Sequence, residues 1–293
     1  MHFDWQLFEK TLSEDMSADI NIESVDPVSG GDTSRAFQIK TNQADLFVKL
    51  NNPDYEHMFR LEWSGLIEIA SSASIRTPQP VTVGRTQNAA YFVMEYMEFV
   101  DKLDQQAAGK AIADLHHLEH TRFGWDQNNF IGKSVQHNEW HADWAEFYWN
   151  CRLDPQLEAA VELGHTILEN AIEPLRLKTM TLLEHHSVEP SLLHGDLWYG
   201  NIATSIEADV VLYDPAVYWG DPETDIAATK LFGGFTDDFY DAYYQDVPLQ
   251  EGADTRLPLY QLYHWLNHLN MFGASYLEQC LNCISELYAD HRA

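Results

Sequence analysis

The residues best suited to chemistry gather in one segment, Leu193-His-Gly-Asp-Leu-Trp-Tyr-Gly-Asn201. It places the carboxylate of Asp196 five positions before the amide of Asn201, and a second carboxylate, Asp214, follows after a short apolar run. Carboxylate and amide oxygens are hard ligands that suit Mg²⁺, and a positioned carboxylate can also accept a proton from a hydroxyl. Because phosphoryl transfer needs mainly positioning and charge neutralisation, this set indicates transfer of a phosphoryl group to a hydroxyl.

The order of these three residues resembles the pattern of protein kinases. In that pattern the first Asp accepts the proton of the acceptor hydroxyl, the Asn binds Mg²⁺, and the later Asp holds Mg²⁺ against the β- and γ-phosphates. The resemblance implies that Asp196 is the catalytic carboxylate, that Asn201 and Asp214 are metal ligands, and that ATP and Mg²⁺ are the cofactors. An ordinary acidic turn is the alternative, and the combination with Asp214 disfavours it.

Residues near the N-terminus extend the same pattern. Lys49 ends an apolar run, where a lysine is normally avoided unless it has a charged partner or a ligand. Glu62 follows thirteen positions later on a predicted helix, and in kinases such a glutamate orients the lysine toward the α- and β-phosphates. A surface lysine and a solvated glutamate are the alternative for each residue taken alone.

Two backbone elements are expected to contact ATP. Gly30 and Gly31 lie between strand-like runs and would let backbone N–H groups approach the phosphates, although a double glycine there is more often a hairpin turn. Glu95, Tyr96 and Met97 end an apolar strand and are expected to present backbone groups to the adenine edge. This second expectation comes from position alone, because backbone hydrogen bonding leaves no side-chain signature.

Hydrophobic periodicity predicts the elements that must position these residues. Short β-branched or aromatic runs predict strands over 36–40, 46–50, 81–83 and 91–95, interrupted by one helix over 55–72. From about residue 103 the spacing is helical, with helices expected over 106–118, 140–151, 156–186, 225–232 and 257–288, and with strand-like runs at 191–194 and 210–213. The predicted fold class is α+β and bilobal, protein-kinase-like: a small antiparallel-sheet N-lobe over 1–97 and a larger, mainly helical C-lobe over 98–293.

Composition limits the partners. The chain of 293 residues is 45% hydrophobic, enough for a full core, and carries 46 Asp and Glu against 17 Lys and Arg, a net charge of -29. That charge repels nucleic acid and anionic membranes, so neither is expected as a partner, and it favours an amine-bearing second substrate. Without a basic leader or an eighteen-residue apolar run, and with three cysteines too few for a disulfide framework, a cytoplasmic protein is expected.

Longer segments narrow the resemblance to the fructosamine kinase (ketosamine-3-kinase) family, which is related to aminoglycoside phosphotransferases and choline kinases. The segments that select this family are 123–132, 194–201 and 214–235, supported by Phe47-Val-Lys49 and the segments 58–66 and 140–148. The resemblance implies ATP-dependent phosphorylation of a sugar hydroxyl, at O3, of a ketosamine such as a fructosamine or ribulosamine. The acceptor would be a small molecule or a glycated protein lysine, and the O3 phosphate would promote deglycation.

The resemblance also suggests substrate contacts. Trp198, inside the catalytic loop, could line the sugar site, and Asp221 or Glu223 could meet the amine. Asp225 follows Pro222 at a predicted helix start, so an N-cap role explains it, and in the superfamily an acidic residue here braces the catalytic loop. Gly195 stands where protein kinases carry Arg, and no Ala-Pro-Glu segment follows, so control by activation-loop phosphorylation is not expected.

Other interpretations stay open. A kinase of another small amine or alcohol, such as an aminoglycoside or choline, would use the same catalytic residues, and a pseudokinase scaffold would bind nucleotide alone. The Cys280-Leu-Asn-Cys283 pair could bind metal or act in redox chemistry, but free cysteines packed on a helix explain it. The His pairs at 116–117 and 185–186 suit helix C-termini, and the aromatic run at 239–244 suits core packing.

Overall fold

The computed structural model describes residues 3–29, 34–71 and 75–289, which form two compact units. The first unit contains the chain up to Lys102 together with Thr204–Asp214, and the second contains Leu103–Ala203 and the chain from Pro215 onward. The sequence predicted a division after residue 97, with each unit formed by one continuous segment of the chain. In the structure the first unit extends to Lys102 and also takes in the segment that carries Asp214.

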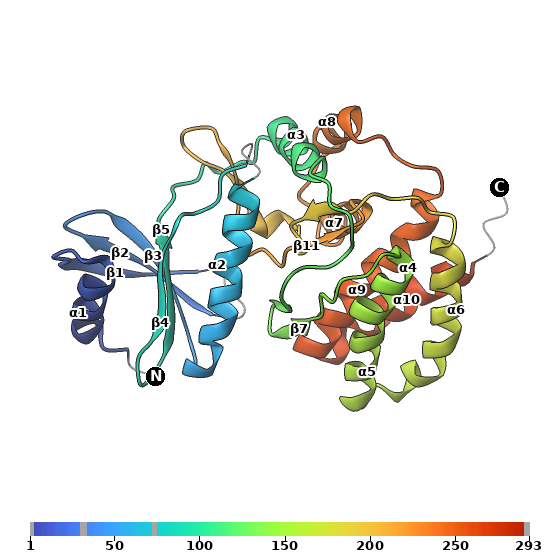
Figure 1. Cartoon of the computed structure of the whole chain (residues 1–293), viewed down its shortest axis with the longest axis horizontal. Helices are drawn as coiled ribbons and strands as arrows, with labels where there is room; N and C mark the ends of the chain where they lie inside the picture. The colour runs from blue at the N-terminus through green and yellow to red at the C-terminus, as the bar shows by residue number, and fades with distance from the viewer. Residues whose placement is uncertain (1–2, 30–33, 72–74, 290–293) are drawn as a thin grey trace. The chain divides into compact units, whose positions relative to one another are not determined.

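The first unit is built on a five-stranded antiparallel sheet with the strand order β1-β2-β3-β5-β4 (Figure 1). Its strands are β1 (Ile22–Val28), β2 (Arg35–Thr41), β3 (Asp45–Asn51), β4 (Pro80–Arg85) and β5 (Ala90–Glu95). The four predicted strands are confirmed, whereas β1 was not predicted. Arg76 joins Thr204–Asp214 to this unit, because its backbone pairs with β10 (Val210–Leu212): Arg76 N donates to Val210 O at 3.1 Å, and Leu212 N donates to Arg76 O at 3.0 Å.

The expectation of one helix in this unit was wrong. Besides the predicted helix, α2 (Glu56–Ala70), the chain begins with α1 (Trp5–Met16). Asp4 caps α1, since its carboxylate accepts hydrogen bonds from the backbone N–H groups of Gln6 and Leu7, both at 3.1 Å. One turn apart, Phe8 and Leu12 place their side chains on the same face of the helix, and both are fully buried.

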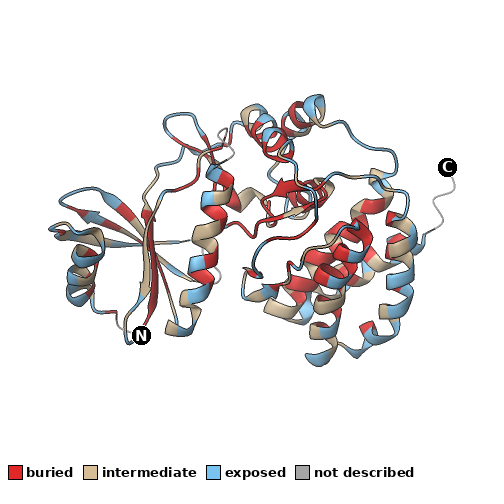
Figure 2. Ribbon diagram, in the orientation of Figure 1, coloured by how far each residue is buried: buried red, intermediate tan, exposed pale blue. Residues whose placement is uncertain are grey.

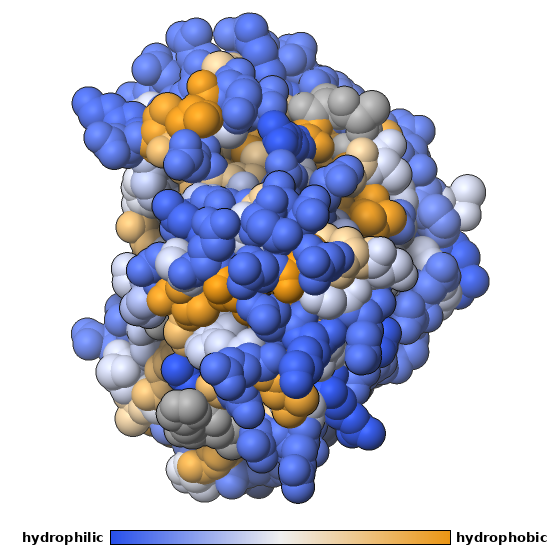
Figure 3. Space-filling model, turned by 90° about the vertical axis from the view of Figure 1, so that its left-hand side faces the viewer, coloured by the Kyte–Doolittle hydropathy of each residue, from blue (hydrophilic) through white to orange (hydrophobic). Residues whose placement is uncertain are grey.

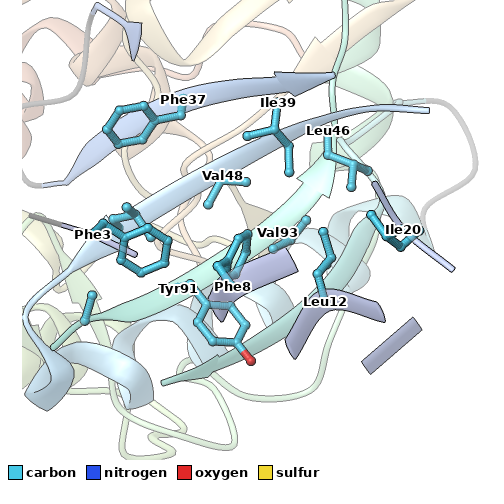
Figure 4. Close-up of a cluster of buried hydrophobic side chains, with 12 residues drawn as sticks. Phe3, Phe8, Leu12, Ile20, Phe37, Ile39, Leu46, Val48, Tyr91 and Val93 are labelled. Carbon is cyan, nitrogen blue, oxygen red and sulfur yellow. The ribbon is translucent and has the colours of Figure 1, made fainter. Parts of the chain in front are cut away.

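Helix α1 closes a hydrophobic core over the sheet (Figure 4). Phe8 meets the edge of the Tyr91 ring from β5, with 5.1 Å between ring centroids. Ile39 of β2 and Val48 of β3 are fully buried in the same cluster. Full burial of an aliphatic or aromatic side chain of this size contributes about 1.5–3 kcal/mol, so this core holds the strand that carries Lys49.

The second unit is mainly helical. Its helices are α3 (Gln105–His116), α4 (Trp144–Tyr148), α5 (Asp154–Glu162), α6 (Ile172–Leu183), α7 (Glu223–Thr229), α8 (Asp237–Asp246), α9 (Ala253–Phe272) and α10 (Leu277–Tyr288). Two short ribbons accompany them: β8 (Ser191–Leu193) with β11 (Tyr218–Gly220), and β6 (Asn129–Ile131) with β7 (Ser134–Gln136). A third ribbon pairs β9 (Ile202–Thr204) with β10, which belongs to the first unit. Buried residues concentrate along α9 and around β11 (Figure 2).

Several predicted helices are shorter than expected. The helix predicted over 156–186 is interrupted, because Gly164 after α5 adopts φ +100°, which ends a helix and suits glycine. The helix predicted over 257–288 is divided in the same way at Gly273, whose φ is +92°. Cys280 and Cys283 lie buried on α10, and burial raises the pKa of each thiol to about 12, which agrees with packing rather than reactivity.

The surface is largely hydrophilic on the face drawn in Figure 3, where apolar residues form separate small groups. Across the described part of the chain, no helix has both the length and the apolar character needed to cross a membrane. The hydrophilic surface in Figure 3 agrees with the acidic composition.

The core under α1 gives a stability prediction. Phe8→Ala should lower the free energy of unfolding by about 3–5 kcal/mol, because it removes a fully buried ring and leaves a cavity. Leu7→Ala is the matched control: Leu7 lies on the same helix but is 54% exposed, so its loss should cost less than about 0.5 kcal/mol. Urea unfolding followed by tryptophan fluorescence measures both, and equal losses would contradict the packing described here.

Candidate active site

The first unit brings Lys49, Glu62 and Asp214 together. Lys49 lies on β3 and Glu62 on α2, and the Lys49 Nζ is 2.6 Å from the Glu62 Oε1. The same ammonium also contacts the carboxylate of Asp214. The side chains of Lys49 and Glu62 are only 11% and 13% exposed, so the buried lysine has the charged partners that the sequence required.

The burial of Lys49 and Glu62 changes their pKa values. Burial alone would lower the pKa of Lys49, but the two carboxylates outweigh it and hold the pKa above its ordinary value. Burial raises the pKa of Glu62 to about 7, against the opposing charge of Lys49 and assisted by that of Asp214. Glu62 therefore changes its protonation state close to neutral pH.

Asp214 follows β10 in a left-handed backbone conformation, with φ +57°. Aspartate tolerates this conformation better than most residues, and such positions are common where a side chain must be aimed. Its Oδ1 faces Lys49, while its Oδ2 makes no hydrogen bond to any residue that the structure describes, and the side chain is 44% exposed. A hard oxygen is thus left accessible, which is the donor that Mg²⁺ requires.

The strand end expected to meet adenine is β5. Its last residue, Glu95, uses its side chain within the unit: Arg76 Nη2 lies 2.6 Å away. Tyr96 N donates to Asp45 O at 3.3 Å. The next amide, that of Met97, has no hydrogen-bond partner within residues 3–29, 34–71 and 75–289, so it is available to a ligand. Gly30 and Gly31 lie outside the described residues.

The catalytic loop of the second unit follows β8. Gly195 has φ +81°, and a Cβ placed on it would lie 2.0 Å from the backbone oxygen of Ala216. The loop is held at that point, because Ala216 N donates to His194 O at 2.9 Å. Asp196 N in turn donates to His194 Nδ1 at 3.2 Å. This close approach is the physical reason for glycine at the position where protein kinases carry arginine.

Asn201 contacts the carboxylate that the sequence marked as catalytic. Its Nδ2 donates to the backbone oxygen of Asp196 at 2.9 Å and to Oδ2 of the same residue at 3.2 Å. Asn201 is 4% exposed, and its own Oδ1 makes no hydrogen bond to the described residues. The amide thus fixes the orientation of the Asp196 carboxylate and keeps one oxygen for a cation, so its donor set fits Mg²⁺.

Asp225 holds this loop from α7. Its Oδ2 accepts a hydrogen bond from His194 N at 2.7 Å, and its Oδ1 accepts one from Gly195 N at 2.9 Å. The bracing role suggested by the resemblance is confirmed by these contacts. The N-cap role was wrong, because α7 begins at Glu223 and Asp225 lies in its first turn.

His116, the last residue of α3, also contacts Asp225, with 3.2 Å between Nε2 and Oδ2. Burial alone would raise the pKa of Asp225, but the hydrogen bond and charge of His116, with those of His194, outweigh it and hold the pKa below its ordinary value. The sequence analysis missed this partner, since it explained His116 by the helix dipole alone.

The three residues suggested for the substrate have different surroundings. Trp198 is half-buried and meets the edge of Phe232, with 5.9 Å between ring centroids. Asp221 is 1% exposed and accepts hydrogen bonds from the Tyr260 hydroxyl at 2.5 Å and from His186 Nε2 at 2.7 Å. Both oxygens of Glu223 bind Arg256 at 2.7 Å.

These two carboxylates line a cavity whose walls include neither Asp196 nor Trp198. His186, Tyr260 and Arg256 were also missed. No spacing rule could have found them, since Arg256 lies 33 positions from Glu223 and Tyr260 lies 39 positions from Asp221.

The tight approach at Gly195 predicts a specific loss of stability. Gly195→Ala should cost at least about 3 kcal/mol, because it adds a backbone clash to the strain of a positive φ. Gly164→Ala is the matched control, with φ +100° and no atom within 4 Å of the added Cβ, so it should cost only about 1–2 kcal/mol. Urea unfolding measures the loss of unfolding free energy in both variants. An equal loss would mean that the catalytic loop shifts to accommodate the added methyl group without a further penalty.

Comparison with known proteins gives one family. The fructosamine kinase family model matches residues 4–290. A probable ketoamine kinase of Vibrio parahaemolyticus is 37% identical over 287 residues, which cover 97% of this chain and 99% of the relative. The chloroplastic protein-ribulosamine 3-kinase of Arabidopsis thaliana is 35% identical over 278 residues, which cover 90% of this chain and 82% of the relative.

Solved structures agree with this result. The crystal structure of a candidate fructosamine-3-kinase from Haemophilus somnus superposes with a TM-score of 0.89 at 28% identity, covering 97% of this chain and 98% of that one. An aminoglycoside phosphotransferase shares the fold with a TM-score of 0.60 at 14% identity, covering 97% of each chain. The predicted protein-kinase-like fold class is confirmed. The chain belongs to the fructosamine kinase family and is an ATP-dependent phosphotransferase.

Proposed function

We propose that the chain transfers the γ-phosphoryl group of ATP to a sugar hydroxyl of a ketosamine, with Asp196 as the catalytic carboxylate. The observation that carries this proposal is the pair of contacts from Asn201 to Asp196, in a loop whose backbone Asp225 holds. The names of the relatives support the acceptor, because they are ketoamine kinases and a ribulosamine 3-kinase. The hydroxyl is O3, and the O3 phosphate makes the adduct unstable and releases the amine, so the activity is deglycating.

The chemical step follows from a fixed carboxylate. The acceptor oxygen forms a bond to the γ-phosphorus while the bond from that phosphorus to the β–γ bridging oxygen breaks, and ADP leaves. Asp196 accepts the proton of the hydroxyl, for which it must lie within hydrogen-bond reach. Asn201 is the positioning residue for this carboxylate, since its Nδ2 is 3.2 Å from Asp196 Oδ2.

Two cations, the Lys49 ammonium and Mg²⁺, bind the phosphates of ATP. Lys49 contacts the α- and β-phosphates and Glu62 orients its ammonium, as their 2.6 Å ion pair supports. Mg²⁺, held by Asn201 Oδ1 and the Asp214 carboxylate, would neutralise charge on the β- and γ-phosphates. The Met97 amide donates to the adenine edge beside Glu95 and Tyr96.

The acceptor sugar contacts aromatic faces. Trp198 follows the catalytic carboxylate closely and is half-buried, so its exposed part suits stacking against a sugar ring, and its π face suits an amine. Phe232, 44% exposed, extends the same aromatic surface. Asp221 and Glu223 were suggested for the amine, but their bonds to Tyr260 and Arg256 favour the different role argued below.

A substrate panel tests the proposal. Asp196→Asn should lower the turnover number at least about 100-fold on ribulosyl-lysine or fructosyl-lysine, because it removes the proton acceptor. Asp241→Asn is the control, since it makes the same change on an exposed face of α8. ATP consumption with Mg²⁺ is measured, with choline and kanamycin in the same panel. Turnover confined to choline or kanamycin would overturn the acceptor, and unchanged turnover in Asp196→Asn would overturn the role of this carboxylate.

The pKa of Glu62 predicts a pH dependence. Since burial raises it to about 7, Glu62 loses its charge as the pH falls through 7, and the Lys49 ammonium then lacks a charged partner. The kcat/KM for MgATP should therefore fall on the acid side of about pH 7, because this ratio reports the free enzyme. In Glu62→Gln the ratio should be lower and its acid limb should disappear; an unchanged limb would assign it to another group.

A further inference from the structure

The second unit contains a cavity of about 320 Å³ that the proposed reaction does not use. The ends of α3, α7 and α8 and the segment 187–191 form its walls. Its polar lining is acidic, with four carboxylates from Glu189, Asp221, Glu223 and Asp246, while Val188, Ile226 and Leu249 supply apolar surface. A site of this composition repels anions and suits a cation that also has an apolar part.

The carboxylates of this cavity have two different roles. Asp221 is buried and Glu223 is half-buried, and Tyr260, His186 and Arg256 already bind their oxygens. Glu189 and Asp246 are exposed, and neither carboxylate makes a hydrogen bond or ion pair to any residue in the described part of the chain. These two exposed carboxylates are therefore acceptors that remain available to a ligand.

A bare metal ion fits this cavity poorly. His186, Asp221 and Glu223 do place their ligand atoms within 4.8 Å of one another. However, both Glu223 oxygens bind Arg256, and an ion would have to displace that guanidinium. Tyr244, also in the wall and only partly exposed, offers an aromatic face, which favours an alkyl ammonium group over a metal ion.

The cavity wall is also connected to the catalytic loop. Tyr243 and His116 both line the cavity, and the Tyr243 hydroxyl is 2.8 Å from His116 Nδ1. The other ring nitrogen of His116 contacts Asp225, which binds the backbone of His194 and Gly195, immediately before Asp196. Tyr243, His116 and Asp225 are each at most 3% exposed, so water does not compete with these contacts.

We infer that this cavity is a second binding site, for a small organic cation such as an aliphatic diamine, and that its occupancy acts on the catalytic loop through Tyr243, His116 and Asp225. Such a ligand changes the loop only as far as it binds two arrangements of these residues with different affinity. The binding itself is independent of the proposed function, whereas an effect on turnover rests on the proposed role of Asp196.

Calorimetric titration with 1,4-diaminobutane tests the binding. The double variant Glu189→Gln/Asp246→Asn should weaken its Kd at least fivefold, because it removes the two available carboxylates. The control Asp238→Asn/Asp241→Asn removes the same charge from exposed positions of α8 outside the cavity and should leave the Kd unchanged. 1,4-Butanediol, of similar shape but neutral, should not bind. Absence of diamine binding, or equal weakening in both double variants, would overturn the site.

Hydrogen exchange at residues 192–196 tests the connection. Saturating diamine should change the exchange rate there at least twofold in the native chain, with a change of similar size in kcat. Tyr243→Phe keeps the ring but removes the hydroxyl, so it should bind the diamine and lose the exchange effect. Bound diamine without a change in exchange would overturn the connection. A change in exchange in the native chain together with unchanged turnover in Asp196→Asn would leave the cavity supported and would contradict only the role proposed for Asp196.

Discussion

One buried carboxylate, that of Asp225, determines the shape of the catalytic loop. A charge at 1% exposure is unfavourable unless hydrogen bonds replace water, and here two backbone N–H groups and the His116 ring do so. The amides belong to His194 and Gly195, so satisfying the charge also fixes the backbone that leads into Asp196. The loop geometry and the burial of Asp225 are therefore one constraint: neither is stable without the other.

The first unit satisfies a buried charge of opposite sign in the same manner. Lys49 is surrounded by Glu62 and Asp214, and one of these partners lies on α2 while the other follows β10. The hydrophobic core between α1 and the sheet keeps β3 in position, so the apolar packing and the ionic group depend on each other. In both units, charge pairs or hydrogen bonds hold the functional side chains in position.

Sequence reasoning succeeded where short-range rules apply. Short β-branched or aromatic runs predicted four strands, and motif order predicted the pairing of Lys49 with Glu62 and placed Asp196 and Asn201 in one loop. It missed α1, although Asp4 before Phe8 and Leu12 was an available N-cap signal. It predicted continuous helices across Gly164 and Gly273, where the structure ends them. It could not predict the cavity, because the partners of Asp221 and Asp225 are distant in the sequence and periodicity carries no information about such contacts.

The segment Thr204–Asp214 has a consequence for how this architecture can be divided. It packs with the first unit through Arg76, which pairs with Val210 and Leu212 and whose guanidinium binds Asp209 at 3.2 Å, yet the chain on both sides of it belongs to the second unit. A polypeptide cut after Lys102 would lack Asp214 and leave Lys49 with half of its charge compensation. The smaller unit is thus not encoded by one continuous stretch of the gene. Gene fusion or recombination can exchange it only as two separate pieces of coding sequence.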